Sequence, residues 1–187
     1  MIAGAADLLF APWRVARLMA FLDPFKYSDD AGYQVVQSLY AIGSGGVFGE
    51  GFAQGQAKLF YLPYPYSDFI FSVVGEELGL IGTLAVVLAF ALLFWRGTRA
   101  AMLAPDRFGM LLGIGLITGL IVQALFNISV VISILPAKGI PLPFISYGGS
   151  SVVVSLVAIG ILLSISRFAG APERSTSTSR KTASRRR

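Results

Sequence analysis

The sequence contains no cysteine and no histidine. Disulfide bonds, catalytic thiolates, a Ser-His-Asp triad, and zinc or haem sites built on these side chains are therefore excluded. A metal ion would have to bind oxygen ligands, which suits hard divalent cations such as Mg²⁺ or Mn²⁺. We expect no organic cofactor, and the identity of any metal stays open.

Charged residues are also scarce, at 13% of the 187 residues, whereas 55% are hydrophobic. Soluble domains usually carry about 25% charged residues. The net charge of +5 comes from the C-terminal end, where seven basic residues and one acidic residue follow Ser166. Residues 169–187 hold no large apolar side chain, which predicts a disordered basic tail and gives no reason to expect nucleic-acid binding.

Long apolar runs take the place of the missing charges. About 20 apolar residues suffice to cross a bilayer as a helix, and we predict membrane-spanning helices at 68–95, 108–132 and 150–168. Residues 1–12 are too short to span and lack the positive start of a secretory signal, so we interpret them as the end of a truncated transmembrane helix. The sequence thus predicts an all-α integral membrane protein, a polytopic helix bundle.

Small residues in the spans indicate close helix packing. Gly75, Gly79 and Gly82 lie on one face of the first span, and Gly115 and Gly119 repeat a spacing of four in the second. Small residues at this spacing let helices approach each other in lipid. We therefore assign these glycines to packing and not to chemistry.

Lys and Arg counts orient the spans, because cytoplasmic loops carry an excess of both. Residues 96–107 hold three and the tail holds more, whereas 133–149 has only Lys138. We expect 96–107 and 169–187 in the cytoplasm, and 13–67 and 133–149 outside.

The segment 13–67 is too long and too rich in apolar residues for a linker, which predicts a large extracellular loop with short helices. Residues 12–22 are typical of an amphipathic helix, in which Arg17 either anchors at the interface or contacts a lipid diphosphate. Six glycines between 43 and 55 either cradle an anion or form a turn-rich re-entrant segment. No Gly-Lys-Ser/Thr sequence ends this run, so it is not a nucleotide-binding loop.

Acidic residues mark the start of the first span. Asp68 can cap the following helix or serve as an acid or base at the membrane surface. Glu76 and Glu77 are functional candidates, because ionisable groups inside a membrane are costly, unless they hydrogen-bond within the bundle. On a continuous helix with about 100° per residue, Asp68 and Glu76 share one broad face.

The segment 133–149 contains three prolines, which preclude a continuous helix. It ends in a Gly-Gly-Ser-Ser run at 148–151, where the free N–H groups of a helix start favour an anion. Lys138, Lys58 and Asp68 would meet if both outer segments fold onto the same end of the bundle.

Several motifs in the same order resemble those of the SEDS family (FtsW/RodA/SpoVE), and among its branches they are most similar to the cell-division protein FtsW. The motifs are Phe21-Leu-Asp-Pro24, Gly32-Tyr-Gln34, Ala41-Ile-Gly-Ser-Gly-Gly46, Asp68-Phe-Ile-Phe71, Gly75-Glu-Glu-Leu-Gly79 and the run 135–151. One departure stands out: family members have an acidic residue and a histidine shortly before the acid at Asp68, whereas this chain has Tyr64-Pro-Tyr-Ser67.

The resemblance implies the C-terminal part of a fold of about ten helices, and therefore a fragment whose activity alone is in question. It implies a peptidoglycan glycosyltransferase that polymerises lipid II in the bacterial cytoplasmic (inner) membrane. Expected partners are a class B penicillin-binding protein transpeptidase and other divisome membrane proteins. The process could be cell division, elongation or sporulation.

The resemblance makes Asp68 the candidate catalytic residue of an inverting displacement with an undecaprenyl-diphosphate leaving group. Such a reaction needs a base for the sugar hydroxyl and positive charge, or a divalent cation, for the diphosphate. The remaining candidates are substrate-binding Lys58, Lys138, Arg17, Ser146 and Ser150, and supporting Glu76 and Glu77. Two other functions stay open: a lipid II flippase or transporter, which would place its binding residues mid-span, and a non-catalytic divisome scaffold.

Overall fold

The computed structural model describes residues 19–27, 32–51 and 68–168. Every regular element in these ranges is a helix: α3 (Tyr33–Gly45), α4 (Ile70–Met102), α5 (Arg107–Val131) and α6 (Gly149–Arg167). The predictions for 1–12, Arg17, Lys58 and the tail 169–187 lie outside the described residues. Of the predicted amphipathic helix at 12–22, only 19–22 is described, and these residues are helical.

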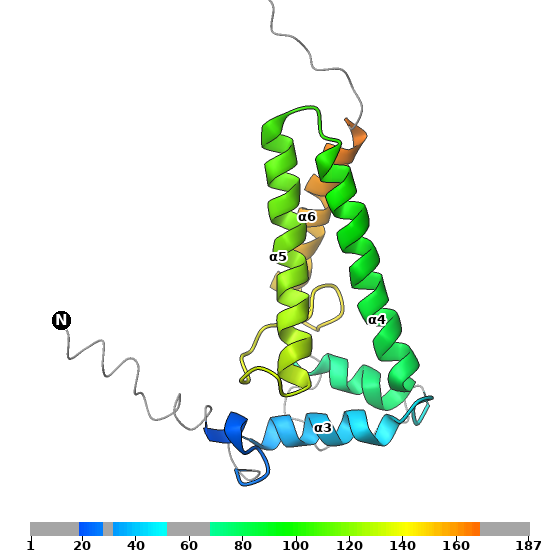
Figure 1. Ribbon diagram of the computed structural model, residues 1–187, viewed down its shortest axis with the longest axis vertical. Coiled ribbons are helices and arrows are strands. Elements are labelled where there is room, and N and C mark those ends of the chain that lie inside the picture. The colour runs from blue at the N-terminus through cyan, green and yellow to red at the C-terminus, as the bar shows by residue number, and fades with distance from the viewer. Residues whose placement is uncertain (1–18, 28–31, 52–67, 169–187) are drawn as a thin grey trace, which may run out of the picture.

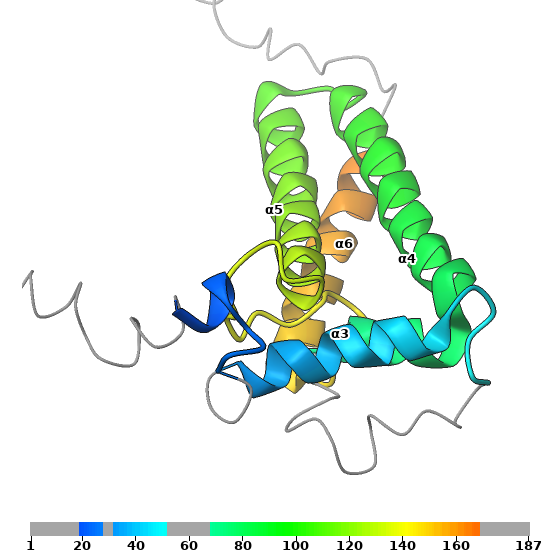
Figure 2. The same cartoon turned by 60° about the horizontal axis from the view of Figure 1, so that its bottom comes forward.

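Helices α4, α5 and α6 stand side by side, and α3 lies across one end of them (Figures 1 and 2). All three upright helices are long and apolar enough to cross a membrane. Only 17% of the most apolar stretch of α4 and of α6, and 28% of that of α5, is buried against the rest of the protein. Water-soluble proteins rarely expose apolar surface on this scale, so these faces suit lipid or further helices.

The ends of the spans differ from the prediction mainly at α4. The predicted spans 108–132 and 150–168 correspond to α5 and α6, but α4 continues past residue 95 to Met102. Most of the predicted loop 96–107 is therefore helical. Arg96 and Arg99 end the apolar run without ending the helix, because arginine is a good helix former. At the other side of the short connection, the Asp106 carboxylate caps α5 by accepting from Gly109 N at 2.7 Å.

Helix α4 is broken at Gly79, whose φ of 63° and ψ of −158° are non-helical. The part before Gly79 runs alongside α3, and the part after it rises through the bundle (Figure 1). The prediction of one continuous helix over 68–95 is therefore wrong. Only glycine adopts this backbone region without a large cost, so the break depends on the residue type at this position.

The break leaves main-chain N–H and C=O groups of α4 without partners inside the helix. The glycine loop (residues 46–51) provides their hydrogen-bond partners. Glu50 N donates to Glu76 O at 2.9 Å and Gly51 N to Glu77 O at 3.2 Å, while Leu80 N donates to Gly46 O at 3.0 Å. Unpaired main-chain groups are costly away from water. The glycine loop and the helix break thus complete each other's hydrogen bonding.

Two glycines permit this contact. A Cβ on Gly45 would overlap Gly75 O, and one on Gly49 would overlap Glu77 O. Of the two interpretations of the glycine-rich run, the structure supports a turn segment for these positions, packed backbone to backbone on α4. Their lack of a side chain serves packing.

Glycines also set the spacing of α4 and α5, but not the pair predicted in α5. A Cβ on Gly97 would come within 2.8 Å of Ile117, and one on Gly113 within 2.7 Å of the Ala101 Cβ. Gly115 and Gly119 have nothing within 4 Å of the corresponding position. The packing face of α5 is therefore the one that carries Gly113.

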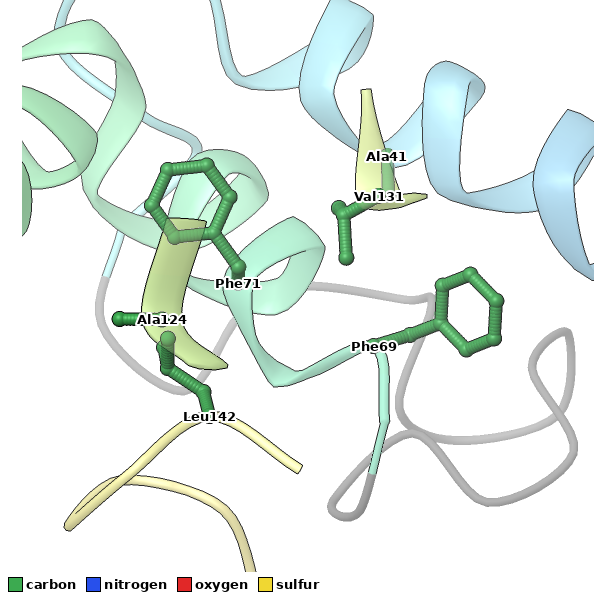
Figure 3. Close-up of a cluster of buried hydrophobic side chains, with 6 residues drawn as sticks. All are labelled: Ala41, Phe69, Phe71, Ala124, Val131 and Leu142. Carbon is green, nitrogen blue, oxygen red and sulfur yellow. The ribbon is translucent and has the colours of Figure 1, made fainter. Parts of the chain in front are cut away.

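The end of the bundle near α3 has its own apolar core (Figure 3). Its buried members come from α3, the start of α4, α5 and the α5–α6 segment (residues 132–148): Ala41, Phe69, Phe71, Ala124, Val131 and Leu142. A buried hydroxyl reinforces it, because Ser38 Oγ donates to Val131 O at 3.0 Å. This core brings three distant parts of the chain together at one end of the helices.

Candidate functional site

Asp68 lies at this end, immediately before the N-cap residue Phe69 of α4. Phe69 and Phe71 are each 4% exposed and anchor the chain that follows in the core. On the α5 side, Asn127 Nδ2 donates to Asp68 O at 2.7 Å. The main chain at Asp68 is therefore held from two directions, while Asp68 itself is only partly buried.

The α5–α6 segment is tied to the same face of α5. Asn127 Nδ2 also donates to Ile140 O at 2.8 Å, and Gln123 Nε2 donates to Pro141 O at 2.9 Å. Residues four apart on a helix share a face, so the two amides can donate hydrogen bonds to consecutive carbonyls of the segment. This arrangement places residues 138–141 beside the start of α4.

The carboxylate of Asp68 lies against Gly139, since a Cβ on that glycine would sit 2.9 Å from Asp68 Oδ2. The neighbouring Lys138 is exposed, and its Nζ lies 5.6 Å from the centre of the Phe126 ring, within cation–π range. A carboxylate and an ammonium group thus come from adjoining positions at one end of the bundle. The structure brings Asp68 against Gly139, the neighbour of Lys138. The meeting of the Asp68 and Lys138 side chains stays a prediction, and Lys58 and Arg17 lie outside the described residues.

The two candidate serines have different surroundings. Ser146 is 2% exposed, and its Oγ accepts from Leu142 N at 2.7 Å while Ser146 N donates to Leu142 O at 3.1 Å. This pair closes a tight turn, so the Ser146 hydroxyl serves the shape of the α5–α6 segment. Ser150 is exposed in the first turn of α6, where a ligand can reach it.

Glu76 and Glu77 are buried, at 4% and 8% exposure, in the part of α4 that precedes the break. They lie beside α3 and not midway along the upright part of the helix, because the chain turns at Gly79. Asp68 precedes the helix, so the helical-face argument that paired it with Glu76 does not apply. The supporting role expected of Glu76 and Glu77 stays a prediction.

Sequence reasoning missed Asn127 and Gln123. Both are amide side chains within a span that has no charged residue between Phe108 and Ala137. Amides in membrane helices usually hydrogen-bond to neighbouring segments. This signal was available, but it does not say which carbonyls the amides bind.

The described residues contain no group of three or more acidic side chains that would hold a metal ion by themselves. Mg²⁺ is commonly bound by one or two carboxylates together with phosphates of the substrate. Asp68 fits as one such carboxylate. A cation at this end would therefore depend on ligands from the substrate.

A helical membrane protein with a polar site at one end of its spans is the class that this fold and site define. The chain belongs to the FtsW/RodA/SpoVE family of cell cycle proteins, whose model matches residues 1–170. This confirms the family resemblance drawn from the motifs.

Among its relatives, the chain is 47% identical over 161 residues to the stage V sporulation protein E of Bacillus subtilis, covering 86% of this chain and 44% of the relative. It is 50% identical over 161 residues to the probable peptidoglycan glycosyltransferase FtsW of Geobacter sulfurreducens, covering 86% and 43%. The chain thus spans less than half the length of these relatives.

The fold is also similar to a solved structure. One chain of a peptidoglycan synthase complex, described as showing structural coordination of polymerization and crosslinking, superimposes with a TM-score of 0.71 at 26% identity. The match covers 91% of this chain and 46% of the other. With the all-helical described region, it confirms the predicted fold class of a polytopic helical membrane protein.

Proposed function

We propose that this chain forms the catalytic end of a peptidoglycan glycosyltransferase that polymerises lipid II. Relatives named as probable peptidoglycan glycosyltransferases support this function. The observation that carries it is the placement of Asp68, a partly exposed carboxylate held against Gly139 and next to the Lys138 position at one end of the spans.

The chemistry assigned to Asp68 is general base catalysis. Asp68 takes the proton from the sugar hydroxyl of one lipid-linked chain as the hydroxyl oxygen attacks the anomeric carbon of another. The new C–O bond forms as the bond to the diphosphate breaks, and the configuration at the anomeric carbon inverts. A base near the membrane surface suits a substrate whose sugar leaves the bilayer while its lipid stays within it.

The leaving group departs as an undecaprenyl diphosphate, so positive charge must stabilise it. Lys138 supplies an exposed ammonium at this end, and the N-terminus of α6 near Ser150 adds partial positive charge. Arg17 and Lys58 remain predicted contacts. A Mg²⁺ or Mn²⁺ ion, where present, would neutralise diphosphate charge mainly through oxygen ligands that the substrate supplies.

The same proposal covers the cellular setting. The protein would lie in the bacterial cytoplasmic membrane with its C-terminus in the cytoplasm and the Asp68 end outside. The similarity to a chain of a complex that couples polymerization and crosslinking supports a class B penicillin-binding protein as partner. The similarity of the chain to relatives named FtsW supports other divisome membrane proteins as further partners.

The test uses a full-length chimera, in which this chain replaces the matching part of the Geobacter sulfurreducens relative. The chimera and the unmodified relative are reconstituted with the relative's transpeptidase and purified lipid II, and glycan strands are separated on a gel. We expect polymer from the chimera and none from its Asp68→Asn variant. Asp106→Asn is the matched control, because Asn also caps helices and Asp106 lies at the opposite end of α4 and α5.

Two results would contradict the proposal. Equal polymer from the Asp68→Asn variant would move the chemistry to another residue. No polymer from the chimera, with polymer from the relative, would show that this chain does not supply a working site. An Asp68→Asn chimera that makes no polymer but still supports division in cells would leave the polymerase assignment in place and would favour an additional flippase or scaffold role in division.

A further inference from the structure

The side-chain amide of Asn127 joins the two halves of the candidate site. It is 2% exposed, and its one nitrogen donates to both Asp68 O and Ile140 O. Among the residues that the structure describes, its buried Oδ1 has no hydrogen-bond partner. The orientation of the amide follows from its surroundings, since a flipped amide would turn its oxygen toward two carbonyls.

An unpartnered buried acceptor is unfavourable, so a residue used only for packing at this position would be apolar. What the amide provides is a pair of bonds from one atom to two segments that are far apart in the sequence. The bond to Asp68 O sets the peptide plane after Asp68, and through it the direction in which the carboxylate leaves the main chain. The bond to Ile140 O fixes the position of the main chain at Ile140, the residue that follows Gly139. The Asp68 carboxylate rests against Gly139.

We propose that Asn127 is the positioning residue of the polymerase site, acting through Asp68 without contacting the substrate. This inference rests on the proposed function of Asp68. Gln123, one helical turn earlier, already ties the α5–α6 segment to α5 at Pro141. The role that separates Asn127 from Gln123 is therefore its bond to Asp68.

The test compares three variants of the chimera: Asn127→Asp, Asn127→Ala and, as matched control, Gln123→Ala. Asn127→Asp keeps the size of the side chain but lacks the amide nitrogen, so it can donate at most one hydrogen bond, from a protonated carboxyl, in place of the two. For each variant, kcat and KM for lipid II polymerisation are measured per unit of folded protein. The folded amount comes from the monodisperse peak in size-exclusion chromatography, and lipid II binding is measured separately by thermal shift.

We expect both Asn127 variants to lower kcat by about 100-fold, the loss typical of a reacting group displaced by about 1 Å. KM and lipid II binding should stay within about twofold, because the substrate contacts remain in place. Gln123→Ala should lower kcat less than either Asn127 variant, because Gln123 holds the α5–α6 segment at Pro141 and its side chain is not the donor to Asp68 O.

Native kcat per folded molecule in either Asn127 variant would overturn the proposal, and so would an equal loss in Gln123→Ala. A rise in KM with unchanged kcat would also overturn it, since Asn127 would then be a substrate contact. Failure of the function itself is seen separately, as retained polymerisation in Asp68→Asn.

Discussion

Gly79 and Gly49 lie so close that a Cβ on Gly79 would overlap the main-chain nitrogen of Gly49. The two glycines come from the helix break in α4 and from the glycine loop, and neither backbone could approach the other with a side chain between them. The chain before Gly79 runs along α3 (Figure 2). Asp68 directly precedes the N-cap residue of this part of α4 and therefore lies at the same end of the bundle.

Substitution of Gly79 should therefore destabilise the protein. Gly79→Ala combines an overlap with Gly49 and a backbone conformation that costs about 1–3 kcal/mol for residues other than glycine. We expect a clear fall in melting temperature in detergent micelles, measured by tryptophan fluorescence. Gly115→Ala is the control, because Gly115 has open space around it, and a fall of the same size in that variant would contradict the assignment.

The packing of α4 on α5 gives a second matched pair. Gly113→Val places a branched side chain against Ala101, whereas a Cβ at Gly115 on the same helix meets no described residue within 4 Å. Overpacking of this kind typically costs about 1–3 kcal/mol. The melting temperature of Gly113→Val should fall well below that of Gly115→Val, and equal values would show that α5 packs through a different face.

Lys138 should matter for substrate binding more than for stability, because its side chain is exposed. In the chimera, we expect Lys138→Met to raise KM for lipid II about tenfold, since a hydrogen bond to a charged group contributes about 1.5–3 kcal/mol. Lys138→Arg keeps the positive charge and should stay near the unmodified KM. An unchanged KM in Lys138→Met would remove this residue from the proposed diphosphate contacts.

Substitution of the two serines of the α5–α6 region should have different effects on thermal stability. Ser146→Ala leaves the buried Leu142 N–H without the acceptor it has now, and an unsatisfied buried group costs about 1–3 kcal/mol. We expect lower thermal stability for Ser146→Ala and no change for Ser150→Ala. If Ser150 contacts the substrate, Ser150→Ala will raise KM while thermal stability stays native. A Ser146→Ala variant with native stability would contradict the turn-closing role of Ser146.

The sequence by itself determined the spans and the chemical candidate. Transfer of a helix into lipid depends on its own composition, so the apolar runs at 108–132 and 150–168 were enough to locate α5 and α6. Asp68 was singled out by its motif and by its place at the start of an apolar run. The spans follow from the composition of neighbouring residues, and the choice of Asp68 follows from the resemblance of its motif to the family, so neither depends on long-range contacts.

Only the tertiary structure decided the break at Gly79, the partner of the glycine loop and the two bonds of Asn127. Each joins residues far apart in the chain, and Asn127 and Asp68 are 59 positions from one another. A glycine in an apolar helix is compatible with packing or with a break, and an amide can bind any nearby carbonyl. The choice is made by which backbone groups the folded chain leaves unpaired, and those are known only once the segments have come together.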